Sequence, residues 1–420
     1  MSFSCSLSHH ILFQALSQVF KAACLSDASN NVERGQAQAL LPPLARALTK
    51  QLSKEEGDDE LEIENRFAIA DATSEIMWDA YEHKTSNGQR VAQITVADAR
   101  EVVLRIMALI QDCLGRRSNL ISEMVNYSFD NDEIARCEDK ARSESEYLTH
   151  LVDSVGYQLK SLGPNFAHIF KESVAGPLGR VLTASTHDAR AKFAAVCLFD
   201  DCVEHCGPTA ANTYAPVLLE GIKAALDDNM NEDVELKQVA VYGISQIARH
   251  SPKSLSPSVG QDLLMKVYNI AKEVETVPKE DIEHIVLVEN AVSSMASLAL
   301  LRGSPLFDCV PDKSALLKTF MCSLPLEQDY DEAKICHDGL CDLVDSNMIN
   351  VQAEYSTLIR IIGKILALVS EDEVVASQST CSRLMGVIHK IQQSVDNNSI
   401  QVAFSMMEPD SQQALVAAMQ

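Results

Sequence analysis

Aromatic residues are scarce in this 420-residue sequence. Phe, Tyr and Trp together make up 5% of it, and Trp78 is the one tryptophan. Leu, Ala, Val and Ile supply most of the 46% hydrophobic content instead. With 22% charged residues, the chain is too apolar for global disorder. Its composition therefore suits a core in which helices pack on helices.

The sequence also lacks a long apolar run. The longest candidates carry Gln, Ser, Lys or Asp at helical intervals, so none approaches the roughly 20 apolar residues that a membrane helix needs. Residues Leu7–Leu25 are fairly apolar, but Met1–Ser8 contains no Lys or Arg. We therefore interpret this segment as the first helix of the fold and not as a signal peptide. No membrane insertion is expected.

Basic residues are in deficit, with 35 Lys and Arg against 59 Asp and Glu, a net charge of -24. A field of this sign repels nucleic-acid phosphates and disfavours anionic membranes, whereas it attracts Lys- and Arg-rich ligands. Solubility of a large helical surface explains the same excess. The charge thus argues against nucleic-acid binding and leaves two interpretations open, a basic protein partner and simple solvation.

Motifs for catalysis are absent. The chain has no Gly-rich phosphate loop, no Gly-x-Ser-x-Gly elbow and no His-Glu-x-x-His pair. Cys202, His205 and Cys206 suggest a metal, but no second cluster supplies the missing ligands at zinc-site spacing. Most of the twelve Cys fall in apolar helical faces, which is typical of small buried side chains in a reducing compartment. We expect no enzyme activity, no cofactor and no metal.

Repeats organise the chain. The helical segments Ala195–Pro208 and Val239–Pro252 have similar endings, and Tyr214–Leu226 reads as a helix between them. Matching inner segments recur about every 40 to 50 residues, close to the period of HEAT repeats. They lie around Val155, Ala195, Ala240, Ala291 and Gly339. The pattern predicts an all-α fold, a HEAT-repeat solenoid in which antiparallel helix pairs form a right-handed superhelix, as a single array over residues 1–420.

Some boundaries can be predicted within this array. Pro42-Pro43 predicts a helix start near Leu41, because proline is tolerated in a first turn. The charged segment Asp130–Glu146 predicts an exposed extension of a buried helix that follows it. Further helices are expected over 96–114, 120–129, 371–395 and from Pro409.

The segment 189–420 resembles a known family at five places in the same order. These are Cys197-Leu198-Phe199-Asp200-Asp201-Cys202-Val203-Glu204-His205-Cys206-Gly207-Pro208, Glu235–Gly243, Glu289–Ser293, Leu340–Asn347 and Pro409–Ala414. They resemble repeats near the C-terminus of the importin beta superfamily of karyopherins, of the importin beta-3 (importin five) type. Residues 1–188 fit the architecture with a weaker resemblance. Ala194 stands where the family has a tryptophan.

The resemblance implies a nuclear import receptor that shuttles between cytoplasm and nucleus, acts as a monomer, binds cargo with basic localisation signals, and binds Phe-Gly nucleoporins. Family members release cargo to Ran-GTP and are more than twice as long. Their N-terminal repeats, which hold most Ran contacts, have no counterpart here. The expectation is a fragment or short form corresponding to the C-terminal portion. A HEAT scaffold of a phosphatase or chromatin complex is the alternative.

Candidate contact residues follow from the acidic and apolar helix faces. The cargo candidates are Asp200, Asp201, Glu204, Asp342 and Asp345, for which capping of or bridging to a neighbouring helix is the alternative. The nucleoporin candidates are Leu218, Leu219, Ile222, Leu263, Leu264 and Val267, for which ordinary packing between repeats explains the pattern equally well.

Overall fold

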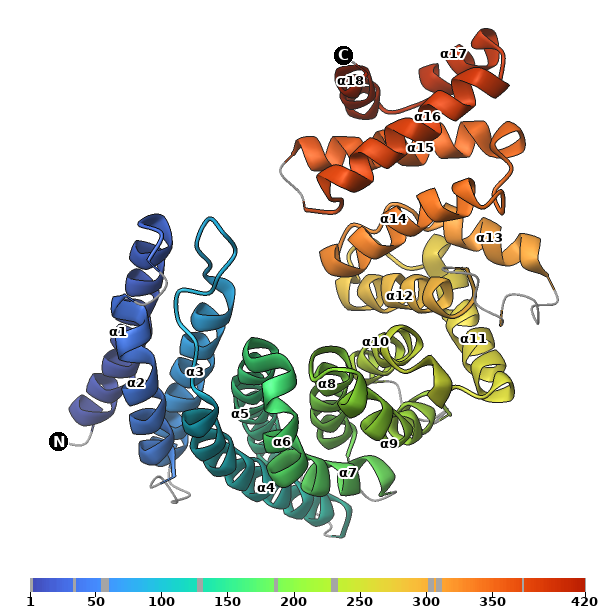
Figure 1. The fold of residues 1–420 in the computed structure, drawn as a ribbon. Helices are drawn as coiled ribbons and strands as arrows, with labels where there is room; N and C mark the ends of the chain where they lie inside the picture. Colours follow the sequence, from blue (N-terminus) through green and yellow to red (C-terminus); the bar gives the residue numbers. More distant parts are fainter. Residues whose placement is uncertain are drawn as a thin grey trace. The chain divides into compact units, whose positions relative to one another are not determined.

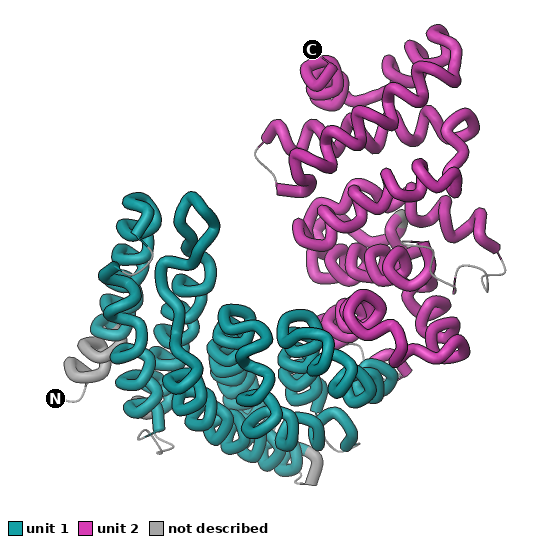
Figure 2. Tube along the Cα trace, in the orientation of Figure 1, with its two compact units in different colours: residues 1–224 teal, residues 225–420 magenta. Residues whose placement is uncertain are grey.

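The computed structural model is built from helices (Figure 1). It describes residues 3–32, 35–53, 60–126, 131–184, 188–227, 233–300, 306, 312–371 and 374–419. Within these ranges no strand is present, apart from an isolated bridge between Lys84 and Arg90. The chain divides into two compact units, residues 1–224 and 225–420 (Figure 2), which are described separately.

Unit 1 is a row of helices with a second layer beside it (Figure 1). We call α1, α3, α5 and α8 the inner row, since each packs on the next. Helices α2, α4 and α7 each pack against an inner-row neighbour, α3, α5 and α8 respectively. The bounds are α1 Phe3–Ser29, α2 Gln36–Leu52, α3 Glu60–Glu82, α4 Val96–Asn126, α5 Asn131–Leu162, α6 Ala167–Ile169, α7 Ala175–Thr183, α8 Ala189–His205 and α9 Pro208–Asp227.

Unit 2 repeats this arrangement. Helices α10, α12, α14 and α16 follow one another by direct packing, α11 packs on α12, and α15 on α16. Helices α17 and α18 pack on α15. The bounds are α10 Val234–His250, α11 Pro257–Ala271, α12 Ile282–Met295, α13 Lys313–Cys322, α14 Tyr330–Asp345, α15 Val351–Ser370, α16 Gln378–Ser394, α17 Asn397–Ser405 and α18 Pro409–Ala418.

Aspartate side chains begin four consecutive helices of these rows. Each accepts a hydrogen bond from the backbone N–H three residues further on. The caps are Asp188 of α8 (2.7 Å), Asp233 of α10 (2.9 Å), Asp281 of α12 (3.2 Å) and Asp329 of α14 (3.1 Å). Such a cap stabilises a helix by about 1 kcal/mol, so the acid-rich sequence also marks where these helices start.

Two predicted helix boundaries are wrong because tertiary contacts override local signals. Helix α2 begins at Gln36, well before Pro42, since Asp27 of α1 accepts a hydrogen bond from Ala37 N–H (2.9 Å) and caps it. The segments predicted over 96–114 and 120–129 are joined in the single helix α4, and residues 127–129 of the second segment lie outside the described residues. Arg116, in the supposed gap, forms an ion pair with Glu144 of α5 (2.8 Å), so a contact with another helix lies beside Gly115, which by itself weakens a helix by roughly 1 kcal/mol.

The C-terminal helices differ less from expectation. The helix expected over 371–395 begins at Gln378, where Ser377 caps it (3.0 Å to Thr380 N). Helix α17 was not predicted, whereas the start of α18 at Pro409 and the long helix α5 are confirmed. No helix in the described part of the chain combines the length and hydropathy needed to cross a membrane.

Candidate protein-binding surface

Three helices of the inner row in unit 1 are almost wholly buried along their middle. Within 71–80 of α3, 151–160 of α5 and 194–204 of α8, three side chains in each remain accessible. They are Asp71, Glu75 and Trp78 on α3, Asp153, Tyr157 and Lys160 on α5, and Cys197, Asp201 and Glu204 on α8. Spacings of three and four residues place each trio on one helix face. We call these nine residues the inner strip.

The centre of the inner strip is aromatic. Trp78 is 42% exposed, and its ring centroid lies 5.2 Å from that of Tyr157 on α5. Tyr81 lies 6.1 Å from both rings, and the Arg90 guanidinium stacks over Tyr81 at 4.8 Å. Aromatic pairs at such distances stabilise each other by about 0.5–1.5 kcal/mol. Trp78 is thus supported by its neighbours while part of it stays open to solvent.

Negative charge surrounds this aromatic centre. Five of the nine inner-strip residues are carboxylates and one, Lys160, is a cation. Lys160 Nζ lies 3.1 Å from Asp201 Oδ1 and links α5 to α8. Burial raises the pKa of Asp153, with nearby Asp201 adding to the shift, although His150 and Lys160 oppose it. Five carboxylates against one lysine leave the strip with an excess of negative charge, so an additional cation would be favoured here.

The predicted Asp200, Asp201 and Glu204 group is divided by the structure. Asp201 and Glu204 belong to the inner strip, whereas Asp200 is 2% exposed. Neither carboxylate oxygen of Asp200 has a hydrogen-bond partner among the described residues. Burial, Asp201 and Glu204 raise its pKa well above the usual value. Asp201 bridges to a neighbouring helix, as the structural alternative supposed, and a cargo contact remains a prediction.

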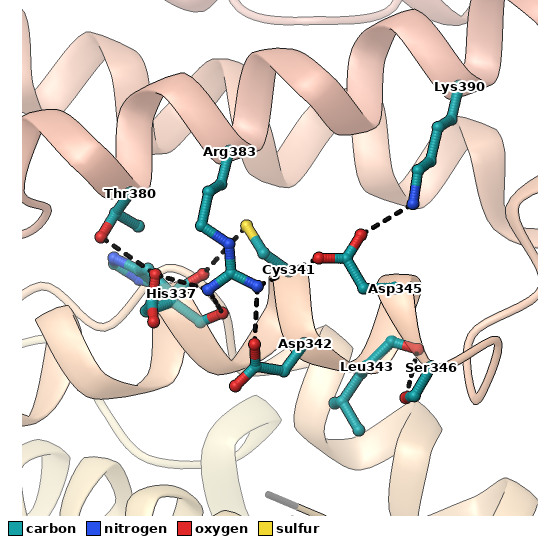
Figure 3. Close-up of polar contacts among 10 residues, drawn as sticks. His337, Cys341, Asp342, Leu343, Asp345, Ser346, Thr380, Arg383 and Lys390 are labelled. Carbon is teal, nitrogen blue, oxygen red and sulfur yellow. Dashed lines mark hydrogen bonds and ion pairs between the residues drawn. The ribbon is translucent and has the colours of Figure 1, made fainter. Parts of the chain in front are cut away.

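The second acidic pair, Asp342 and Asp345 on α14, faces cations of α16 (Figure 3). Arg383 lies 2.6 Å from Asp342 and 3.1 Å from Asp345, and Lys390 lies 2.7 Å from Asp345. These contacts lower the pKa of Asp345, the hydrogen bond from Lys390 contributing most. Both carboxylates are about half exposed. Their charge is therefore largely met within the chain, and their role toward cargo stays a prediction.

The six apolar nucleoporin candidates are all buried in the structure. Leu218, Leu219 and Ile222 lie on α9, and Leu263, Leu264 and Val267 lie on α11. None is more than 6% exposed. Their burial fits the packing alternative that the sequence left open, while nucleoporin binding through these helices remains untested.

Cys202 and Cys206 contact each other in the structure, but His205 does not join them in a cluster of three. Among the described residues, no three His, Cys, Asp or Glu side chains are placed to hold a metal ion. Cys202 and Cys206 are both buried, and a hydrogen bond between the two thiols is the main cause of the raised pKa of Cys202.

Sequence reasoning missed the residues that lie between the acidic positions. Trp78, Tyr157 and Asp153 were not selected, although each is one of the three accessible positions in the buried middle of its helix. The local sequence does not single them out, because Thr73, Ser74 and Asp79 on the same helix are polar and yet buried. One helix considered alone cannot show that its interrupted face meets those of its neighbours.

Comparison with solved structures identifies the fold. Similar chains are a Kap121p mutant (TM-score 0.61, 14% identity), Kap121p bound to Ste12p (0.61, 13%) and the karyopherin Kap121p bound to the SUMO protease Ulp1p (0.55, 11%). Each alignment covers 91% of this chain, but only 31%, 31% and 36% of the other. No family model matches the sequence. The likeness confirms the predicted all-α HEAT-repeat solenoid, and the chain spans about a third of the length of these proteins.

Proposed function

We propose that this chain is part or a short form of a karyopherin of the importin beta superfamily, which binds basic segments of protein cargo and performs no chemistry. One observation supports this most strongly. The inner strip places the exposed Trp78 beside Tyr157 and among five carboxylates. The karyopherin fold and the net charge of -24 agree with it.

The surface suits lysine and arginine side chains for two physical reasons. Their aliphatic stems pack on apolar rings while the charged heads stay near solvent. A cation over an aromatic face gains about 0.5–1 kcal/mol at an exposed site, and tryptophan is the best such partner. Carboxylates at Glu75, Asp153 and Glu204 would then attract the charged heads, with a strength that falls as salt rises.

Removing charge from the inner strip tests the proposal directly. For Glu75→Gln combined with Glu204→Gln, we expect a labelled Lys/Arg-rich peptide to bind about tenfold more weakly at low salt. The matched control is Asp262→Asn with Asp331→Asn, which removes two exposed acids of unit 2. Fluorescence anisotropy measures both. Equal weakening in the two variants would mean that only net charge matters, and would refute a specific surface.

The transport role itself needs cellular partners. We expect the protein to shuttle between cytoplasm and nucleus. In a pull-down from cell extract, it should capture basic nuclear proteins and Phe-Gly nucleoporins. Ran-GTP should not release them if the main Ran-binding repeats of the family are absent. A pull-down with and without Ran-GTP distinguishes the cases. Capture of a phosphatase or chromatin complex without nucleoporins would instead support the scaffold alternative.

A further inference from the structure

Helix α1 lies at the end of the inner row and buries only one of its sides. Helices α3 and α5 each pack between two helices of that row, whereas α1 packs on α3 and α2 (Figure 1). The side chains that α1 buries recur at spacings of one and three residues, and they are Ser17, Phe20, Ala23, Cys24 and Asp27. This spacing places them on one side of the helix, so the opposite side points away from α2 and α3.

Apolar side chains gather on this opposite side. They are Ile11, Leu12, Val19 and Leu25, together with the exposed alanines Ala15 and Ala22. The four large side chains are each between 49% and 58% exposed. At about 100° per residue, all six fall within an arc of about 140°, and we call them the α1 face. Single exposed apolar residues are ordinary, but a contiguous set on one face marks an interaction surface.

The charge around the α1 face favours an uncharged partner. The chain as a whole carries a net charge of -24, which opposes contact between two copies over most of the surface. Residues 1–26, however, contain no Asp or Glu, and Lys21 is their one Lys or Arg. The next residue, Asp27, is buried. Two chains can therefore meet through α1 without bringing acidic side chains together, whereas a basic partner would find no carboxylate on this face.

The pattern of the α1 face is also self-complementary. In a dimer with twofold symmetry, each contact between two residues occurs twice with the roles exchanged. When two α1 helices pack antiparallel about the point midway between Ala15 and Ala22, each Ala15 faces an Ala22 of the other copy, and each Leu12 faces a Leu25. The alanines lie at the centre, so the helix axes can approach to about 8 Å. The leucines flank them, on opposite sides of the contact.

We propose that a second copy of this chain covers the α1 face, in a dimer formed by two antiparallel α1 helices. The apolar side chains that one copy exposes are then buried by the same side chains of the other, and the hydrophobic effect drives the association. This dimer departs from the monomer that the family resemblance implies. The inner strip lies on α3, α5 and α8, so the dimer does not depend on the proposed cargo role.

Sedimentation equilibrium at a series of protein concentrations tests the dimer. We expect the intact chain to form a species of twice the mass of one chain, which dissociates on dilution. Leu12→Glu combined with Leu25→Glu should weaken the association at least about hundredfold, because it places like charges opposite each other twice. Leu12→Lys combined with Leu25→Glu should associate at least about tenfold more tightly than the double glutamate variant, since each introduced lysine then faces a glutamate of the other copy.

Val96→Glu combined with Leu104→Glu is the matched control. It makes the same change of charge at two exposed apolar positions of α4 and should associate like the native chain. Circular dichroism should show native helix content in every variant, because all four positions are exposed. A native chain that stays monomeric would overturn the proposal, and so would equal association of the control and the double glutamate variant. Equal association of the lysine–glutamate and double glutamate variants would overturn the antiparallel arrangement.

Discussion

Replacing His337 with Gln should remove a specific pH dependence from unit 2. The imidazole lies on α14 and is fully buried. Its Nδ1–H donates to the carbonyl of Val375 (2.9 Å), and its Nε2 accepts from Leu326 N–H (3.2 Å). The contact from Leu326 requires the neutral ring, because a protonated Nε2 cannot accept a hydrogen bond. Burial lowers the pKa of His337 to about 4, although the bond to Val375 opposes the shift.

The sign and size of the effect follow from this difference. An unfolded histidine titrates near 6.5, so above that pH both states are neutral and the native stability is complete. As pH falls below 6.5, only the unfolded state binds the proton, and stability is lost down to about pH 4. Between pH 7 and pH 5 the loss due to this one group is about 2 kcal/mol.

Hydrogen exchange of peptides from α14 measures the local free energy of opening. Between pH 7 and pH 5, this free energy of opening should fall in both proteins, and the fall should be about 2 kcal/mol larger in the native chain than in His337→Gln. Titration of carboxylates is common to both proteins and cancels. The control His389→Gln, at an exposed position of α16, should behave like the native chain. The same pH dependence in His337→Gln and the native chain would refute the reasoning.

Three further substitutions test the packing. Arg249→Met should lower the free energy of unfolding by about 3–5 kcal/mol, because it removes the ion pair to Glu332 (2.6 Å) and leaves that carboxylate buried without a cation. Adding Glu332→Gln should recover much of this loss. Chemical denaturation of the single and double variants measures both effects. Asp200→Asn should raise thermal stability at pH 7 but not at pH 4, because the folded state favours the protonated acid; a loss at pH 7 would contradict this. Arg383→Gln should lower the free energy of unfolding by less than about 1 kcal/mol, because the carboxylates that Arg383 pairs with are half exposed. The same substitution should strengthen the binding of a basic peptide near Asp342, and unchanged affinity would argue against a cargo role for that acid.

The architecture was predictable because its signals are periodic and local. Apolar spacing, the repeat interval and the endings of 195–208 and 239–252 indicated helix pairs, and the solved karyopherin structures confirm that fold. The errors arose where another helix decides the outcome. The cap of α2 comes from Asp27 on α1, and Arg116 holds α4 to α5.

The candidate site was less predictable for the same reason. Asp200 and Asp201 are adjacent in sequence, but one is buried and the other pairs with Lys160 on α5. A difference of one residue rotates a side chain by about 100° around a helix, so an acidic pair always divides between faces. Trp78 acquires its significance from Tyr157, which is distant in sequence and is brought to it by the packing of α3 on α5.

The most direct test of the proposed surface uses Trp78 itself, since it is the one tryptophan in the chain. Titration with the peptide Ala-Lys-Arg-Lys-Arg-Ala should change the fluorescence of Trp78 until it saturates. The affinity obtained from this titration should fall as the salt concentration rises, and it should also fall in the variant Glu75→Gln. A peptide that binds by anisotropy while the emission of Trp78 stays constant would contradict binding at the inner strip, and so would the absence of any binding at low salt.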